Sequence, residues 1–246
     1  MNRALYLLKN KAEQGDSISQ YRLGLRFYNG DGVTIDYPQA FDWFLKSAQQ
    51  DYASSLYYLG LMYSKGIGTK IDKKKAIEMY TRCAQLGNIN AQSQLGIMYV
   101  KGKEIGIDYD KAIHWLTKSG EQGNAESQFE LGLIYLKGLG TDVNYKLAFH
   151  WMNSSSEQGS LGAQYYLGLM YANGKGISQD SKLAFFWIKK CAESGNKKAQ
   201  YLLGSIYGNG AVKNKKKSKM WFDKALKNKS PELNEVFNDI AFNFKS

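Results

Sequence analysis

Apolar residues recur along the chain with a helical period, and the same arrangement returns every 36 residues. Within residues 163–176, Ala163, Leu167 and Tyr171 are spaced four apart, which places them on one face of a helix. Each copy carries a Leu-Gly pair followed three residues later by an aromatic side chain. The pairs are Leu23-Gly24, Leu59-Gly60, Leu95-Gly96, Leu131-Gly132, Leu167-Gly168 and Leu203-Gly204. A fixed period of roughly 20 to 50 residues is typical of stacked repeats.

Each repeat is predicted to contain two helices, helix A and helix B. A glycine such as Gly174 ends helix A, because glycine tolerates a left-handed backbone. Helix B then begins after an Asp or Asn, whose side chain accepts hydrogen bonds from the first free amides. These predicted caps are Asp36, Asp72, Asp108, Asn144, Asp180 and Asn214. Helix B carries its own apolar stripe, as at Ala184, Trp187 and Ile188.

We therefore expect an all-α chain that forms one stack of antiparallel helix pairs. Residues 1–15 match the second half of a repeat and predict a lone helix B. Six full A-B repeats follow, at 16–51, 52–87, 88–123, 124–159, 160–195 and 196–229. Residues 230–246 lack the Leu-Gly pair but are amphipathic, and they predict the capping helix that a solenoid requires at its end.

The glycine inside helix A needs a physical reason, because an interior helical glycine costs about 1 kcal/mol relative to alanine. Six copies at one position indicate a site that requires the absence of a side chain. We expect the backbone of a neighbouring helix, or a tryptophan of helix B, to approach closely there.

The complete pattern is Ala/Ser-Gln-x-x-Leu-Gly-x-x-Tyr-x-x-Gly-x-Gly, followed by Asp-x-x-Lys-Ala-x-x-Trp. It resembles the Sel-one-like repeat (SLR) family, a relative of the tetratricopeptide repeat. The resemblance implies a right-handed α-solenoid whose A helices line a concave groove, and an adaptor or scaffold that binds a protein partner there. It also implies two alternatives, an immunity protein that neutralises a secreted bacterial toxin and a hydrolase of the cysteine-rich, β-lactam-binding branch. The hydrolase alternative is disfavoured, because that branch has a disulfide in each repeat and this chain has only Cys83 and Cys191, three repeats apart.

By analogy with tetratricopeptide repeats, the residue three positions before the helix A glycine faces the groove. This position is aromatic in all repeats but one, where Ser93 occupies it. The candidate partner-binding residues are Tyr21, Tyr57, Phe129, Tyr165 and Tyr201, flanked by Arg22, Arg26 and Lys198. The aromatic row has a second interpretation, packing between repeats, which the sequence leaves open.

Positive charge is concentrated at the C-terminal end of the chain. The net charge is +11, and residues 181–246 alone contain 14 lysines and 5 acidic residues. Five of these lysines surround the predicted start of the last helix B: Lys213, Lys215, Lys216, Lys217 and Lys219. Such a patch steers acidic partners towards it. We expect an acidic protein rather than nucleic acid, because the aromatic residues stand at packing positions; a solvated face without a partner is the other interpretation.

Candidate chemistry is sparse. His114 and His150 stand one repeat apart without accompanying ligands, so no metal site is predicted. No nucleophile or phosphate-binding motif is present, and we expect no cofactor and no enzymatic activity. No apolar run is long enough to insert into a membrane. We expect a cytoplasmic protein, or a periplasmic or secreted one if a signal peptide was removed.

Overall fold

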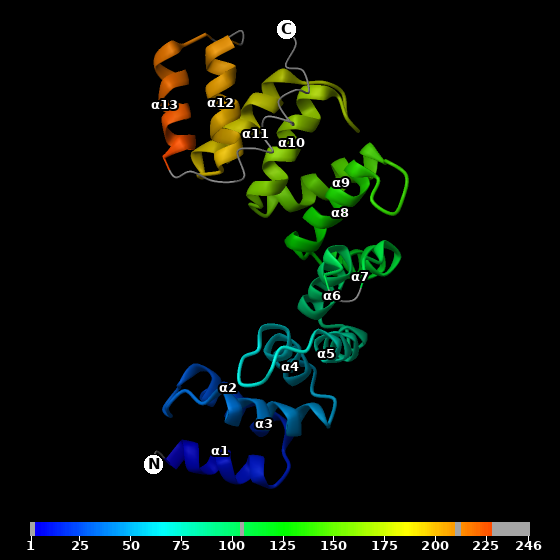
Figure 1. Cartoon of the computed structure of the whole chain (residues 1–246), viewed down its shortest axis with the longest axis vertical. Coiled ribbons are helices and arrows are strands. Elements are labelled where there is room, and N and C mark those ends of the chain that lie inside the picture. Colours follow the sequence, from blue (N-terminus) through cyan, green and yellow to red (C-terminus); the bar gives the residue numbers. More distant parts are fainter. Residues whose placement is uncertain (1–2, 104–105, 210–212, 228–246) are drawn as a thin grey trace. The chain divides into compact units, whose positions relative to one another are not determined.

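A computed structural model describes residues 3–103, 106–209 and 213–227 (Figure 1). These ranges contain thirteen helices and no strand. The chain divides into two compact units, residues 1–122 and 123–246, and each unit is described by itself. The predicted capping helix at 230–246 lies outside the described residues.

The first unit contains the lone helix B and three helix pairs. Its helices are α1 (Arg3–Glu13), α2 (Ser17–Asn29), α3 (Tyr37–Ala48), α4 (Ala53–Lys65), α5 (Lys73–Gln85), α6 (Ile89–Lys101) and α7 (Tyr109–Glu121). Helices α2, α4 and α6 are the A helices, and each packs against the B helix that follows it.

The second unit contains three more pairs. Its helices are α8 (Ala125–Lys137), α9 (Tyr145–Glu157), α10 (Leu161–Asn173), α11 (Ser181–Glu193), α12 (Lys197–Asn209) and α13 (Lys215–Leu226). The last pair is antiparallel, because Gly204 lies against Phe222 and Gly208 lies against Ser218. The prediction of an all-α solenoid built from helix pairs is confirmed.

The predicted caps of the B helices are confirmed in all six pairs. The Asp36 carboxylate, for example, accepts a hydrogen bond of 2.9 Å from the amide of Gln39 at the start of α3. The same bond is formed by Asp72, Asp108, Asn144, Asp180 and Asn214. Helix A ends as predicted, because the glycine that follows it, such as Gly174 with φ 63°, adopts the left-handed conformation.

The glycine inside helix A is a contact point between the two helices of a pair. A Cβ on Gly96 would lie 2.5 Å from Leu116, and one on Gly60 would lie 2.7 Å from Tyr80. The expectation that a tryptophan of helix B takes this place is wrong: the residue after the tryptophan position takes it. Its six occupants are Phe44, Tyr80, Leu116, Met152, Ile188 and Phe222.

The two helices of a pair are joined by a repeated hydrogen bond from helix B to the beginning of helix A. Ser155 donates to the carbonyl of Ala125 at 2.7 Å. Cys83 and Cys191 occupy the equivalent position and donate through sulfur to the carbonyls of Ala53 and Leu161. Both thiols are buried, as predicted for core residues, and each one replaces a serine of the other repeats.

Candidate protein-interaction surface

The side chains of the predicted aromatic row pack against neighbouring helices. Tyr21 is half-buried, and its ring centroid lies 6.0 Å from that of Phe44, 5.1 Å from that of Tyr52 and 6.0 Å from that of Tyr58. Burial raises the pKa of the Tyr21 hydroxyl. Tyr21 therefore contacts both its own helix B and the next helix A, which is the packing interpretation of this position.

The other members of the row make related contacts. Tyr57 packs on Tyr80 with a centroid distance of 5.8 Å, and Tyr201 packs on Phe222 at 5.0 Å. Phe129 fills the space beside Gly162 of α10, where a Cβ would lie 2.7 Å from its ring. Only 1% of Tyr165 is exposed, so this side chain presents no surface to a partner. Tyr21, Tyr57, Phe129 and Tyr201 remain half-buried, and a binding role for their exposed edges stays a prediction.

The surface that helix A presents to the preceding helix A is formed by other positions. In the second unit, α8 and α10 border a pocket of about 200 Å³. Helix α10 contributes Tyr166, Leu169, Met170 and Asn173 to this pocket, which are two residues before and one, two and five residues after Gly168. Helix α8 contributes Leu136 and Lys137. Tyr166, Leu169, Met170 and Asn173 are not among the predicted binding residues. The available signal is the residue two before the glycine, which is neither uniformly apolar nor uniformly polar among the repeats.

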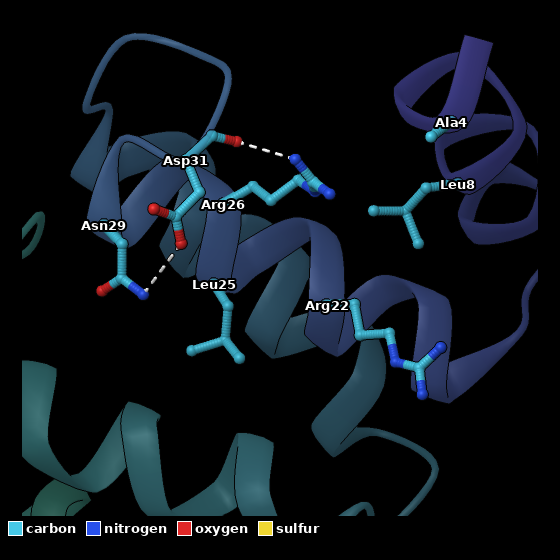
Figure 2. Close-up of a pocket in the computed structure, with 7 residues that line it drawn as sticks. All are labelled: Ala4, Leu8, Arg22, Leu25, Arg26, Asn29 and Asp31. Carbon is cyan, nitrogen blue, oxygen red and sulfur yellow. Dashed lines mark hydrogen bonds between the residues drawn. The ribbon is translucent and has the colours of Figure 1, made fainter. Parts of the chain in front are cut away.

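Two of the predicted flanking residues belong to this second set of positions. Arg22 and Arg26 of α2 are equivalent to Tyr166 and Met170 of α10, and they line a pocket of about 380 Å³ in the first unit (Figure 2). Arg26 donates a hydrogen bond of 2.9 Å to the carbonyl of Asp31. Lys198 is half-buried near the beginning of α12, at the opposite end of the α12–α13 pair from the other predicted lysines.

The five lysines of the predicted patch are all exposed, as a patch that attracts a partner requires. They are Lys213, Lys215, Lys216, Lys217 and Lys219. Four of them are in the first two turns of α13, and the Lys217 ammonium lies 5.2 Å from the centroid of the Tyr207 ring. Lysines in a first turn oppose the helix dipole, so their presence here does not serve the stability of α13.

A second pattern of lysines covers the tryptophans of the B helices. Lys46 lies 4.2 Å from the centroid of Trp43, and Lys224 lies 4.4 Å from that of Trp221. The same pairing, three residues apart, joins Lys118 to Trp115 and Lys190 to Trp187. These contacts place a lysine ammonium over four tryptophan rings of the B helices.

The described residues contain little that points to catalysis. No group of three His, Cys, Asp or Glu side chains suited to a metal ion occurs among them. His114 and His150 are exposed, and each packs edge-on against the tryptophan that follows it, with a centroid distance of 4.9 Å. Burial raises the pKa of the Cys83 and Cys191 thiols to about 12, which keeps both in the unreactive thiol form at neutral pH.

None of the described helices has both the length and the apolar character needed to cross a bilayer.

The model of the Sel1 repeat family matches this chain six times. The matched residues are 17–52, 53–88, 89–124, 125–160, 162–196 and 197–230, which together cover most of the chain. No curated protein matches the chain.

Solved structures give the same assignment. A protective antigen of uropathogenic Escherichia coli strains, which displays an SLR fold, is 31% identical with a TM-score of 0.85. The match covers 98% of this chain and 53% of the antigen, so the chain spans about half of the antigen's length. A Sel1 repeat protein from Oxalobacter formigenes is 31% identical with a TM-score of 0.75, over 87% of this chain and 88% of that protein.

An immunity protein from Pseudomonas aeruginosa is a more distant match. It is 18% identical with a TM-score of 0.47, over 86% of this chain and 81% of its own. A likeness at this level carries no argument about function.

Proposed function

This chain belongs to the Sel1 repeat family, and from that premise we propose that it is a non-enzymatic adaptor that binds a protein partner along its A helices. Proteins of this family are generally protein-interaction scaffolds. The observation that carries the proposal is the surface between α8 and α10, where Tyr166 and Leu169 lie beside the polar ends of Lys137 and Asn173. Aromatic and aliphatic side chains with polar groups around them are characteristic of interface hot spots.

The lysine patch at the beginning of α13 supports an acidic partner. All five side chains are exposed, and no carboxylate of the described residues lies within ion-pair distance of any of them. Exposed charges at the rim of an interface act mainly on the rate of encounter. We infer that the acidic part of the partner approaches this end of α13.

Capture of partners by the tagged full-length chain, followed by mass spectrometry, tests the proposal. The double variant Tyr166→Ala, Leu169→Ala removes the side chains of the α10 surface. Its matched control is Phe186→Ala on helix B α11, because Phe186 is 52% exposed and does not line the pocket between α8 and α10. A partner lost by the double variant and retained by the control supports binding along the A helices. A partner retained by the double variant and lost by the control places the binding surface on the B helices and overturns the proposal.

Two narrower possibilities are separated by direct assays. Protection of cells that co-express a toxin and this chain, together with direct binding, would make the partner a toxin and the chain an immunity protein. Turnover of the chromogenic β-lactam nitrocefin by the purified chain would place it among hydrolases. The buried Cys83 and Cys191 thiols offer no nucleophile for such a reaction.

A further inference from the structure

The B helices of the second unit expose apolar side chains at two positions where the B helices of the first three helix pairs carry only polar ones. In α9, α11 and α13 (Figure 1), the residues three and six positions after the cap include Leu147, Leu183, Phe186 and Met220. Each of these four residues is between 39% and 52% exposed. The equivalent residues of α3, α5 and α7 are also exposed, and they are Gln39, Asp42, Lys75, Glu78, Lys111 and His114. Because the positions are exposed in both units, burial in the fold does not explain the apolar residues.

Apolar and cationic groups share one exposed face of α11. Leu183, Phe186 and Lys190 are spaced at i, i+3 and i+7, which places them on one stripe of the helix. The Phe186 ring packs edge-on against Trp187 with a centroid distance of 5.3 Å, and the Lys190 ammonium lies 4.9 Å from the centroid of Trp187. Equivalent positions of stacked repeats lie on the same side of the stack, so α9 and α13 extend this surface. The surface is called the B-helix face below, and its apolar members are Leu147, Leu183, Phe186 and Met220.

The charge of these helices argues against a second copy of the chain on the B-helix face. Helices α9, α11 and α13 contain nine lysines and only three carboxylates. On α11, the exposed Lys182, Lys189 and Lys190 stand within four residues of Phe186. Only Lys189 of these three forms an ion pair among the described residues, with Glu193 at 3.7 Å. Two such faces in contact would bring like charges together, which is unfavourable. The B-helix face therefore suits a negatively charged surface.

The mixture of side chains favours lipid over protein as that surface. Protein interfaces are depleted in lysine, above all at their centre, whereas each apolar residue of the B-helix face has a lysine within four residues. Surfaces that lie on a bilayer combine lysine with leucine and phenylalanine, because the apolar groups enter the boundary between headgroups and acyl chains. The long lysine stems lie along apolar surface while their ammonium groups reach the phosphates. Clusters of four to eight basic residues are typical of binding to anionic lipids.

We propose that the B-helix face of the second unit binds the surface of an anionic lipid bilayer. Leu183 and Phe186 of α11 enter the headgroup region, and Lys182, Lys189 and Lys190 contact the lipid phosphates. The proposal concerns other helices than the protein-binding function, which uses the A helices. A chain with both surfaces would hold a protein partner at a membrane.

Flotation of the full-length chain with lipid vesicles at low ionic strength tests the proposal. One set of vesicles is pure phosphatidylcholine, and the other contains about one-third phosphatidylserine, which makes its surface anionic. The deciding variant is Leu183→Lys, Phe186→Glu. It gives α11 the residues that α5 carries at the same positions, Lys75 and Glu78, and it leaves the net charge unchanged. The control variant Tyr166→Ala, Leu169→Ala alters the α10 surface instead.

We expect the parent chain to float with the anionic vesicles and not with pure phosphatidylcholine. The α11 variant should bind the anionic vesicles at least about tenfold more weakly, because interfacial binding scales with the apolar area that is inserted. The variant Lys182→Gln, Lys189→Gln should bind more weakly and depend less on salt. The α10 control should bind as the parent chain does. Melting curves followed by circular dichroism should coincide for all four chains, since the altered residues of α11 are exposed, and they separate lost binding from unfolding.

Three results would overturn the proposal: no flotation with the anionic vesicles, equal flotation with both sets of vesicles, or equal binding by the parent chain and the α11 variant. Capture of an acidic protein without lipid, lost in the α11 variant, would make a protein the occupant of the B-helix face and contradict a lipid surface. Self-association of the chain that the α11 variant abolishes would make it a second copy. Failure of the protein-binding function is seen separately, because its deciding variant lies on α10.

Discussion

The substitution Ser194→Gln should stabilise the second unit by completing a repeated hydrogen bond. The fourth residue of helix A is a buried glutamine in most repeats, and a second glutamine thirty residues later donates its amide to the first. The pairs are Gln50 to Gln20 at 3.0 Å, Gln122 to Gln92 at 2.8 Å and Gln158 to Gln128 at 2.7 Å. Residue 194 occupies the donor position for Gln164 but is a serine.

The serine leaves a buried acceptor without a partner. The Oε1 atom of Gln164 forms no hydrogen bond, and the Ser194 hydroxyl donates to the backbone carbonyl of Lys190, four residues earlier. The backbone at Ser194 (φ −78°, ψ 5°) is close to that at Gln158 (φ −83°, ψ 5°), so a glutamine fits without rearrangement. A net gain of about 1 kcal/mol follows from one hydrogen bond made to a buried, unsatisfied acceptor.

Urea denaturation measures the free energy of unfolding of the parent chain and of the Ser194→Gln variant. A gain of about 1 kcal/mol corresponds to a melting temperature higher by about 2–4 °C. Ser194→Met is the control for side-chain size, since methionine covers the same surface without donating. In a Gln164→Leu background, Ser194→Gln should give no gain, because the acceptor is gone. An equal gain from methionine, or a gain that survives in the Gln164→Leu background, would refute the hydrogen-bond explanation.

Three further outcomes follow from burial and charge. Tyr165→Ala should lower the free energy of unfolding by about 3–5 kcal/mol, as the truncation of other large buried side chains does. Thermal melts followed by circular dichroism measure this change, and an unchanged melting temperature would mean that the ring is exposed. Charge reversal of the lysines at 215–217 should slow association with a captured partner and flatten the salt dependence of the association rate, with little effect on the melting temperature. Stopped-flow kinetics at two salt concentrations measures this rate, and an unchanged rate would exclude a role of the lysine patch in attracting the partner. The Cys83 and Cys191 thiols should resist Ellman's reagent at pH 8 until urea is added, and rapid labelling of the native chain would contradict their burial. Because burial raises the pKa of both thiols from 9.0 to about 12, the free energy of unfolding should fall as the pH rises above 9.

The repeat period and the helix caps could be predicted from the sequence because both are local. A 36-residue spacing and an Asp or Asn before each helix B leave clear signals in the order of residues. The partner of the helix A glycine was predicted less well. The large tryptophan of helix B recurs and is easily recognised in the sequence, whereas the contact residue after it, such as Leu116 or Met152, has no fixed identity. Packing depends on volume at that position, and single residues do not reveal which neighbour supplies the volume.

The surface residues were harder to predict than the fold. The analogy with tetratricopeptide repeats predicts a groove-facing row that includes Tyr21 and Tyr165, but Tyr21 packs against both Phe44 and Tyr58, and only 1% of Tyr165 is exposed. The residues that border the pockets, such as Tyr166 and Leu169, stand at positions whose chemistry changes from repeat to repeat. Their exposure depends on the angle between successive A helices, and a residue pattern does not encode that angle directly.

Site-specific photo-crosslinking tests the central claim, that a protein partner binds along the A helices, most directly. A benzoylphenylalanine is placed at Tyr166 on the α10 surface, or at the exposed Phe186 of α11, in the full-length chain. Both positions already carry an aromatic ring, so each change adds the same benzoyl group to an existing aromatic site. We predict that the captured partner crosslinks from residue 166 and not from residue 186. Crosslinking from residue 186 alone would contradict the account and place the partner on the B helices.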